Sequence, residues 1–272
     1  MLRKSIQLIC SDIDGTLLNK ERALSPKTIA VLQGLAINYP IILISSRMPQ
    51  SMQLLQKELG IENQPLIAYN GSLILNQRKT LFSQEIPFSV LEKIVGYVES
   101  TDIHLSLYHK DEWLVPQEDY WAKRERRNTK VNYKVQSLKE SLKSWETRTI
   151  SAHKIMCMGD ASQIDLLYKT LKNKHDDEIH IYRSKETYIE VSHIKQDKAS
   201  ALKFLLNKAF KTIDARNVIA FGDNYNDKTL LEQVGSGIAV ANAKQEILAV
   251  ANDICLSNIE DGVALYLEQN LV

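Results

Sequence analysis

The stretch Asp12-Ile13-Asp14-Gly15-Thr16 decides the fold that this sequence predicts. It directly follows Ile6-Gln7-Leu8-Ile9-Cys10, a mostly apolar run of the kind that forms a buried parallel strand. Open α/β sheets bind ligands at the carboxyl ends of their strands, which is where the two aspartates would lie. Because glycine lets the backbone turn, the two carboxylates can lie side by side as a nucleophile and a proton donor. Asp-Gly is also ordinary turn chemistry, so these residues alone leave both interpretations open.

Length and composition indicate a globular protein with almost no net charge. The 272 residues can hold one large α/β domain or two smaller ones. The formal charge of +1 argues against binding to nucleic acid or to a membrane surface through bulk charge. There is no evident signal peptide and no apolar run near the roughly 20 residues of a membrane helix, so we expect a cytoplasmic protein. The widely spaced Cys10, Cys157 and Cys255 are expected to be buried apolar residues.

The N-terminal part of the sequence predicts two further parallel strands. Ser25-Pro26 has the form of a helix N-cap followed by a first-turn proline. This helix leads to the apolar run Ile41–Ile44, which ends in Ser45-Ser46-Arg47. A second helix leads to Leu66–Tyr69 and then to Asn70-Gly71. Strand, helix and strand in succession, with polar residues at the strand ends, are typical of βαβ units.

The same pattern resumes near the C-terminus. A helix expected from Lys198 leads to Asn217–Phe221, a buried strand that ends in Gly222-Asp223-Asn224-Tyr225-Asn226-Asp227. Gly237–Val240 and Ile254–Leu256 predict two more short strands. Both ends of the chain therefore contribute strands to one parallel sheet.

The residues between these two parts have a different character. Ser89-Val90-Leu91-Glu92 has the form of a capping box at a helix start, and His104–Tyr108 alternates like a half-exposed strand. Further strands are expected at Glu112–Val115, Lys154–Met158, Ile179–Tyr182 and Tyr188–Val191. This pattern predicts an inserted α+β domain with an antiparallel sheet covered by helices on one face. Residues 83–192 would form the insertion, and residues 1–82 and 193–272 an α/β core with a Rossmann-like, three-layer parallel sheet.

Polar and acidic side chains gather at the carboxyl edge of the predicted sheet. The residues at strand ends and at one helix start are Asp12, Asp14, Ser45, Lys198, Asp223, Asn226 and Asp227. Because unpaired carboxylates repel one another, this cluster favours a hard divalent cation with oxygen ligands. Mg²⁺ fits best, since it uses one or two carboxylates and leaves room for a substrate phosphate. Lys198 and Ser45 would then neutralise and hydrogen-bond the phosphoryl oxygens.

Four short motifs, in order along the chain, carry a family resemblance. They are Asp12–Thr16, Ser45, Lys198 and Gly222–Asp227. Together they resemble the four motifs of the haloacid dehalogenase superfamily, specifically the Cof-type phosphatases with a large α/β cap of the C2B type. The resemblance covers essentially the whole chain. It departs from the usual family pattern at Ser46 and Ala199, where glycine is frequent.

The resemblance implies a phosphatase that works through an aspartyl-phosphate. Asp12 would attack the phosphorus, and Asp14 would protonate the leaving oxygen and later deprotonate water. Mg²⁺ would be held by the Asp12 carboxylate, the Asp14 backbone carbonyl and Asp223. The other implied site residues are Ser45, Lys198, Asn226 and Gly15 at the phosphate, Asp227 against Lys198 or a water of the metal, and Arg47, Asn70 and Gly71 as candidate substrate contacts.

The expected partner is a small phosphorylated metabolite, with sugar phosphates, pyridoxal phosphate and FMN as candidates. Two alternatives stay open: a phosphomutase that returns the phosphoryl group, and a regulatory protein that binds phosphate without turnover. The presence of Asp12, Asp14, Lys198 and Asp223 together argues against the second. The sequence carries no signal of the oligomeric state.

Three other features have more ordinary interpretations. The basic run Lys123–Arg127 is interpreted as a solvated helix face in preference to a substrate contact. Arg47 either lines the site or makes a structural ion pair. The six histidines show no metal-ligand spacing along the sequence.

Overall fold

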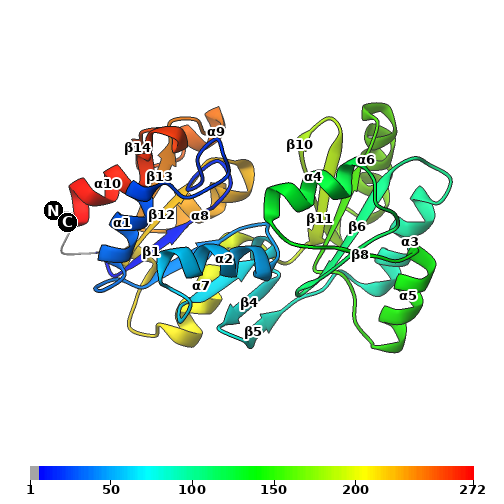
Figure 1. The fold of residues 1–272 in the computed structure, drawn as a ribbon, viewed down its shortest axis with the longest axis horizontal. Coiled ribbons are helices and arrows are strands. Elements are labelled where there is room, and N and C mark those ends of the chain that lie inside the picture. The colour runs from blue at the N-terminus through cyan, green and yellow to red at the C-terminus, as the bar shows by residue number, and fades with distance from the viewer. Residues whose placement is uncertain (1–5) are drawn as a thin grey trace. The chain divides into compact units, whose positions relative to one another are not determined.

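A computed structural model describes residues 6–272 of the chain (Figure 1). The contacts divide the chain into two compact units. The first consists of residues up to Arg47 together with Met52–Leu81 and Asp197–Val272, and the second of Met48–Ser51 and Phe82–Gln196. Within residues 6–272, none of the helices is long and apolar enough to cross a membrane.

The first unit is built on an eight-stranded sheet in the order β14-β13-β12-β1-β2-β3-β4-β5. The strands from β14 to β3 are parallel, and β4 pairs antiparallel with β3. The strands are β1 (Leu8–Ser11), β2 (Ile41–Ile44), β3 (Pro65–Ala68), β4 (Leu73–Asn76), β5 (Lys79–Ser83), β12 (Val218–Gly222), β13 (Ser236–Val240) and β14 (Asp253–Cys255). Every residue of β1, β2, β3 and β12 is buried, as expected of apolar parallel strands with helices on both faces.

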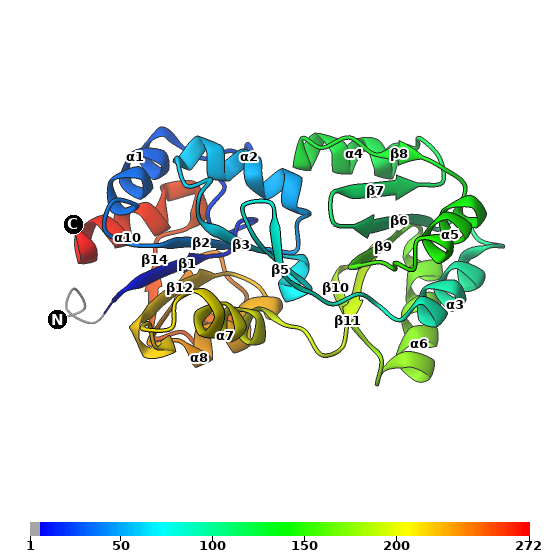
Figure 2. The same cartoon turned by 90° about the horizontal axis from the view of Figure 1, so that it is seen from below.

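Helices cover both faces of this sheet and complete three layers (Figure 2). One layer holds α1 (Pro26–Leu35), α2 (Pro49–Leu59) and α10 (Gly262–Leu271), and the other holds α7 (Lys198–Ala209) and α8 (Lys228–Gln233). A short helix, α9 (Gln245–Leu248), precedes β14. The predicted N-cap is confirmed, because the Ser25 side chain accepts a hydrogen bond from the Thr28 backbone N–H. The predicted Rossmann-like parallel-sheet core is therefore confirmed.

The second unit contains a six-stranded sheet in the order β10-β11-β9-β6-β7-β8. Its strands are β6 (His104–His109), β7 (Glu112–Val115), β8 (Lys134–Val135), β9 (Lys154–Met158), β10 (Ile179–Lys185) and β11 (Tyr188–His193). All pairs are antiparallel apart from the short β8, which runs parallel to β7. Alternate residues such as Leu105 and Leu107 pack with α3 (Phe88–Val98), α5 (Leu138–Thr147) and α6 (Ala161–His175) in one apolar core. The α+β character expected of the insertion is confirmed, but β6 is buried at every position and not half-exposed as predicted.

Some local predictions were wrong or incomplete. Helix α3 begins at Phe88 with Pro87 in the N-cap position, so the capping box expected at Ser89–Glu92 does not open it. The basic run lies on α4 (Tyr120–Thr129), where Lys123, Arg126 and Arg127 are exposed, and this confirms the solvated helix face. All three cysteines are free and buried, as predicted.

Candidate active site

Three neighbouring strands bring the predicted site residues to one edge of the first unit's sheet. Strands β2, β1 and β12 are adjacent and parallel, so Ser45, Asp12 and Asp223, which directly follow them, lie at the same edge. The Asp12 backbone N–H donates to the Phe221 carbonyl oxygen at 3.0 Å, which continues the ladder between β1 and β12. Asp12 therefore lies in the middle of the site.

Lys198 joins two of the carboxylates at this edge. Asp197 caps the N-terminus of α7 by accepting from the Ser200 backbone N–H, and Lys198 is the first residue of that helix. Its Nζ donates to Asp12 Oδ1 at 2.5 Å and to Asp227 Oδ1 at 2.6 Å. Burial opposes the charge of this fully buried side chain, but the two carboxylates raise its pKa above the usual value. The lysine therefore stays an ammonium ion.

Asp227 is held through both of its carboxylate oxygens. Its Oδ2 accepts from the backbone N–H groups of Asp223 and Asn224, each at 3.0 Å, while its Oδ1 accepts from Lys198. Gly222 makes this arrangement possible, because a Cβ at that position would lie 2.5 Å from the Cβ of Asp227. The arrangement agrees with the expected contact between Asp227 and Lys198.

Gly15 brings the first motif against Asp223. Its φ of +85° lies in the region that favours glycine, and a Cβ there would lie 2.5 Å from Asp223 Oδ2. Thr16 Oγ1 donates to Asp223 Oδ1 at 3.0 Å, and the Asn242 side-chain amide donates to the Gly15 carbonyl oxygen at 2.8 Å. These contacts hold the loop between Asp12 and Thr16 against the end of β12.

Two arginines bind the carboxylate of Asp14. Arg47 Nε donates to Asp14 Oδ2 at 2.6 Å and Arg47 Nη2 donates to Asp14 Oδ1 at 2.7 Å, a bidentate pair. Arg22 Nη1 also donates to Asp14 Oδ1, at 3.2 Å. Arg47 is buried, whereas Asp14 is partly exposed. Of the two interpretations of Arg47, the structure therefore gives an ion pair, and its partner is the predicted proton donor. Arg22 carried no sequence signal for this contact.

Asn70, Gly71 and Asn226 connect three loops of the site. Asn226 Nδ2 donates to Asn70 Oδ1 at 2.9 Å, and the Asn70 backbone N–H donates to the Ser45 carbonyl oxygen at 2.9 Å. Asn70 has a φ of +54°, which asparagine tolerates better than most residues. Gly71 has a φ of +106°, and a Cβ there would lie 2.5 Å from the Asp197 carbonyl oxygen. The segment after β3 thus packs against the start of α7.

The acidic residues around Asp12 fit a divalent cation. Ligand oxygens of Asp12, Asp223 and Asp227 lie within 4.8 Å of one another. Burial and the negative charge of Asp227 raise the pKa of Asp223 to about 7. Burial also raises the pKa of Asp12, against the opposing effect of Lys198. An added positive charge would stabilise the ionised form of these carboxyl groups. Mg²⁺ suits the site because it prefers oxygen ligands.

A family model described as haloacid dehalogenase-like hydrolase matches residues 9–267. The chain belongs to this family. The hydrolase is 36% identical over 265 residues to a Haemophilus influenzae protein named "Putative phosphatase", and the match covers 96% of this chain and 97% of that protein. It is 25% identical over 270 residues to the 5-amino-6-(5-phospho-D-ribitylamino)uracil phosphatase of Bacillus subtilis, covering 96% of each.

Solved structures agree with this assignment. The crystal structure of a haloacid dehalogenase-like hydrolase from Bacteroides thetaiotaomicron superposes with a TM-score of 0.87 at 25% identity, over 97% of this chain and 99% of that one. The resemblance to the Cof-type hydrolases is thereby confirmed, and so is the fold. The chain is a hydrolase of the phosphatase type.

Proposed function

We propose that this hydrolase is a Mg²⁺-dependent phosphatase that transfers the phosphoryl group of small phosphate monoesters first to Asp12 and then to water. The observation that carries the proposal is the buried contact of Lys198 with both Asp12 and Asp227. Because Lys198 engages only Oδ1 of Asp12, the second carboxylate oxygen is available as the nucleophile. The lysine also places positive charge beside the incoming phosphoryl group.

The residues support a complete two-step reaction. In the first step the Asp12 oxygen bonds to phosphorus, the phosphorus–oxygen bond of the ester breaks, and the leaving oxygen takes a proton from Asp14. In the second step water attacks the phosphorus of the aspartyl-phosphate and gives a proton to Asp14. Inorganic phosphate leaves and the Asp12 carboxylate is restored, so each residue ends as it began.

Arg47 is proposed as a positioning residue for the proton donor. Both oxygens of Asp14 accept from Arg47, so the carboxylate that remains after Asp14 gives its proton to the leaving oxygen is held at both oxygens. The buried guanidinium fixes the direction from which Asp14 approaches, because a bidentate pair restrains the plane of the carboxylate. Ser45 and Asn226, which flank the same edge, are proposed to hydrogen-bond the phosphate.

The Asp12 carboxylate, the Asp14 backbone carbonyl and Asp223 are proposed as the residues that hold Mg²⁺. Asp223 suits this role because burial and Asp227 disfavour its charge, and Gly15 leaves it space. When bound, Mg²⁺ offsets negative charge on the nucleophile and on the phosphoryl group. Asp227 is proposed to act through Lys198, because both of its oxygens already accept hydrogen bonds.

The substrate is proposed to be a small phosphorylated metabolite such as a sugar phosphate, pyridoxal phosphate or an FMN-like ribityl phosphate. The Bacillus subtilis relative, which is named for a phosphorylated ribityl compound, supports the last of these. Leaving-group selection is assigned to the insertion, for which we propose the limits 83–192. A panel of phosphorylated metabolites ranked by kcat/KM would identify the preferred class.

The test of the proposal is hydrolysis of an aryl phosphate in buffer that contains Mg²⁺. Asp12→Asn is expected to abolish phosphate release, whereas Asp214→Asn, at an exposed residue of the same unit, is expected to leave it unchanged. EDTA is expected to stop turnover, and added Mg²⁺ to restore it. Substantial turnover by Asp12→Asn would overturn the nucleophile, and indifference to EDTA would overturn the metal. A requirement for a sugar bisphosphate would identify a mutase instead.

A further inference from the structure

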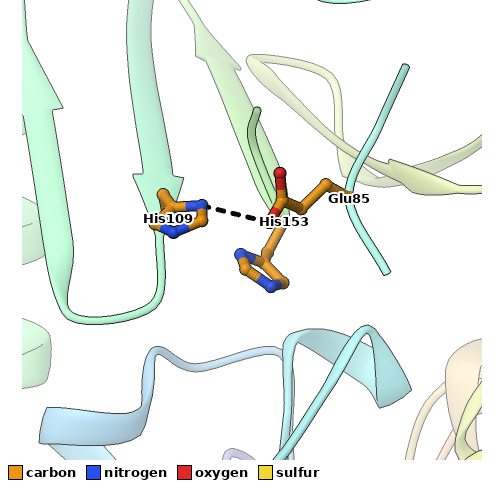
Figure 3. Close-up of side chains that lie close together, drawn as sticks. All are labelled: Glu85, His109 and His153. Atoms are coloured by element: carbon orange, nitrogen blue, oxygen red, sulfur yellow. Dashed lines mark ion pairs between the residues drawn. The ribbon is translucent and has the colours of Figure 1, made fainter. Parts of the chain in front are cut away.

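A second group of possible metal ligands lies in the second unit. Glu85, His109 and His153 each offer a ligand atom, and these atoms lie within 4.8 Å of one another. Figure 3 shows the three side chains turned toward a common space. His109 and His153 are 44 residues apart in sequence, so their spacing does not match a metal-binding motif. We propose that these residues form a binding site for Zn²⁺ or a similar borderline transition-metal ion, separate from the Mg²⁺ site.

Strand pairing builds this group. His109 ends β6 and His153 directly precedes β9, its antiparallel neighbour, and the His153 backbone N–H donates to the Tyr108 carbonyl oxygen at 2.8 Å. The two imidazole rings therefore lie side by side, with centroids 4.9 Å apart. Glu85 follows β5 in a segment that runs beside His153, because the Ile86 backbone N–H donates to the Ala152 carbonyl oxygen at 2.8 Å. Backbone hydrogen bonds thus fix all three positions.

The donor set and the distances suit a four-coordinate ion. Two histidines and one glutamate are a known zinc ligand set, in which a water completes the coordination. His109 Nδ1 lies 3.6 Å from Glu85 Oε1. Ligands at zinc bond lengths around a tetrahedral ion are about 3.4 Å apart, so this pair needs only a small adjustment. Imidazole nitrogens favour such ions over Mg²⁺, which prefers oxygen ligands.

Neighbouring groups orient the ligands as supporting residues do in metal sites. The Ser151 backbone N–H donates to Glu85 Oε2 at 2.6 Å, which turns the other carboxylate oxygen, Oε1, toward His109. His153 Nδ1 accepts from the Lys110 backbone N–H at 3.3 Å, so the ring proton is on Nε2 and is donated to Ser83 Oγ at 2.9 Å. Burial lowers the pKa of His153 to about 3, which keeps this ring neutral.

Ion binding requires two local changes. His109 Nδ1 now donates to the Ser151 carbonyl oxygen at 2.8 Å, so its proton moves to Nε2 when Nδ1 turns to the ion. The long bond from the Lys110 N–H to His153 is exchanged for the metal bond. Two surface cavities of the second unit border this group, one of about 380 Å³ lined in part by Glu85 and Ser151 and one of about 780 Å³ lined in part by His109 and Lys110. The bound ion would join the segment at Glu85 to β6 and β9.

The test is Zn²⁺ titration of the full chain by calorimetry with Mg²⁺ in excess, in an Asp12→Asn, Asp223→Asn background that removes the acidic site. We expect one equivalent of Zn²⁺ to bind. Glu85→Gln keeps an acceptor for the Ser151 N–H. Because loss of a residue that only supports a ligand weakens metal binding by up to about 100-fold, loss of this ligand is expected to weaken Zn²⁺ binding by more than that. The matched control is Glu178→Gln, which alters another histidine–glutamate pair of the second unit, with Glu178 Oε1 2.9 Å from His175 Nδ1. It is expected to leave binding unchanged.

His153→Gln is expected to weaken Zn²⁺ binding as strongly as Glu85→Gln. If circular dichroism shows that His153→Gln does not fold, Glu85→Gln decides alone, because this carboxylate is partly exposed and its loss leaves no cavity. Absence of bound Zn²⁺ in the background variant overturns the proposal. Equal Zn²⁺ affinity of the Glu85→Gln and Glu178→Gln variants overturns it as well. Co²⁺ gives a second readout, since a four-coordinate Co²⁺ spectrum should appear in the background variant and be lost with Glu85→Gln.

Discussion

Replacing Lys198 by methionine should destabilise the first unit and abolish turnover. Methionine has similar length and no charge, so the variant removes the ammonium group and keeps most of the packing. Lys198 is fully buried, with Nζ 2.5 Å from Asp12 and 2.6 Å from Asp227. Loss of one partner of a buried ion pair costs about 3–5 kcal/mol, because the remaining charge stays buried. That is a large part of the roughly 5–15 kcal/mol by which a domain is stable.

The cost should depend on pH. Without Lys198 the buried carboxyl group of Asp12 would have a pKa raised further in the folded state, since burial raises it already and Lys198 opposes that effect. A carboxyl group whose pKa is raised in the folded state lowers the free energy of unfolding when it is ionised in the unfolded state, and has no such effect while it is protonated in both states. Above the unfolded pKa of about 3.8, each pH unit therefore costs the variant about 1.36 kcal/mol through Asp12, until the folded pKa of Asp12 is reached. The stability lost by the variant should be larger at pH 8 than at pH 5.

Urea unfolding in EDTA at these two pH values measures the difference. Lys203→Met is the matched control, because Lys203 is exposed on the same helix and its loss should change the free energy of unfolding by less than about 0.5 kcal/mol. Aryl phosphate hydrolysis in Mg²⁺ is measured in parallel. The reasoning is refuted if Lys198→Met is as stable as the parent protein at pH 8, or if the loss of stability is the same at both pH values.

Three further variants test other parts of the structure. Gly15→Ala places a Cβ 2.5 Å from Asp223 Oδ2 at a φ of +85°, so Mg²⁺ affinity measured by calorimetry should fall, and unchanged affinity would contradict the close approach. Arg47→Lys cannot form the bidentate pair with Asp14, so kcat should fall by about 10²-fold or more, as for loss of a positioned proton donor, while KM changes less. Burial lowers the pKa of His104 in the folded state. Below the unfolded pKa of about 6.5, His104 therefore takes up a proton only in the unfolded chain, which stabilises the unfolded state. The stability difference between the parent and His104→Gln should therefore decrease as the pH falls below 6.5 and stay level above it, which urea unfolding across pH 5–8 would measure.

Much of the parallel sheet could be predicted from the sequence because its strands carry their own signal. Runs such as Ile41–Ile44 are apolar at every position, as expected of a strand that is buried on both faces. The polar residue after each run marks the sheet edge, so the sequence alone predicts that Asp12, Ser45 and Asp223 lie together. Because the carboxyl ends of parallel strands meet at the same edge of a sheet, residues that follow such strands can be placed together without knowledge of the structure.

Other features depend on pairing between distant segments, which leaves no local pattern. The contact of Arg22 with Asp14 depends on how the loop after β1 returns on itself, and arginine in a loop is common. His109 and His153 meet because β6 pairs with β9 in one particular register, and the Ile86–Ala152 backbone hydrogen bond brings Glu85 beside them. A register shift of one residue would turn one of the two histidines to the other face of the sheet, so the cluster exists only in the folded protein.

The charges at the site around Asp12 are consistent with the proposed binding of a divalent cation together with a phosphate ester. The ionisable groups in contact there are the carboxylates of Asp12, Asp14, Asp223 and Asp227 and the cations of Lys198, Arg47 and Arg22. Four negative charges against three positive ones leave an excess of one negative charge when all are ionised. A divalent cation turns this into one positive charge, and a phosphate monoester dianion turns it back to one negative charge. Uptake of one proton by the site then brings the sum to zero. A bound phosphate dianion thus favours uptake of one proton by the site, as the proposed proton transfer to the leaving oxygen requires.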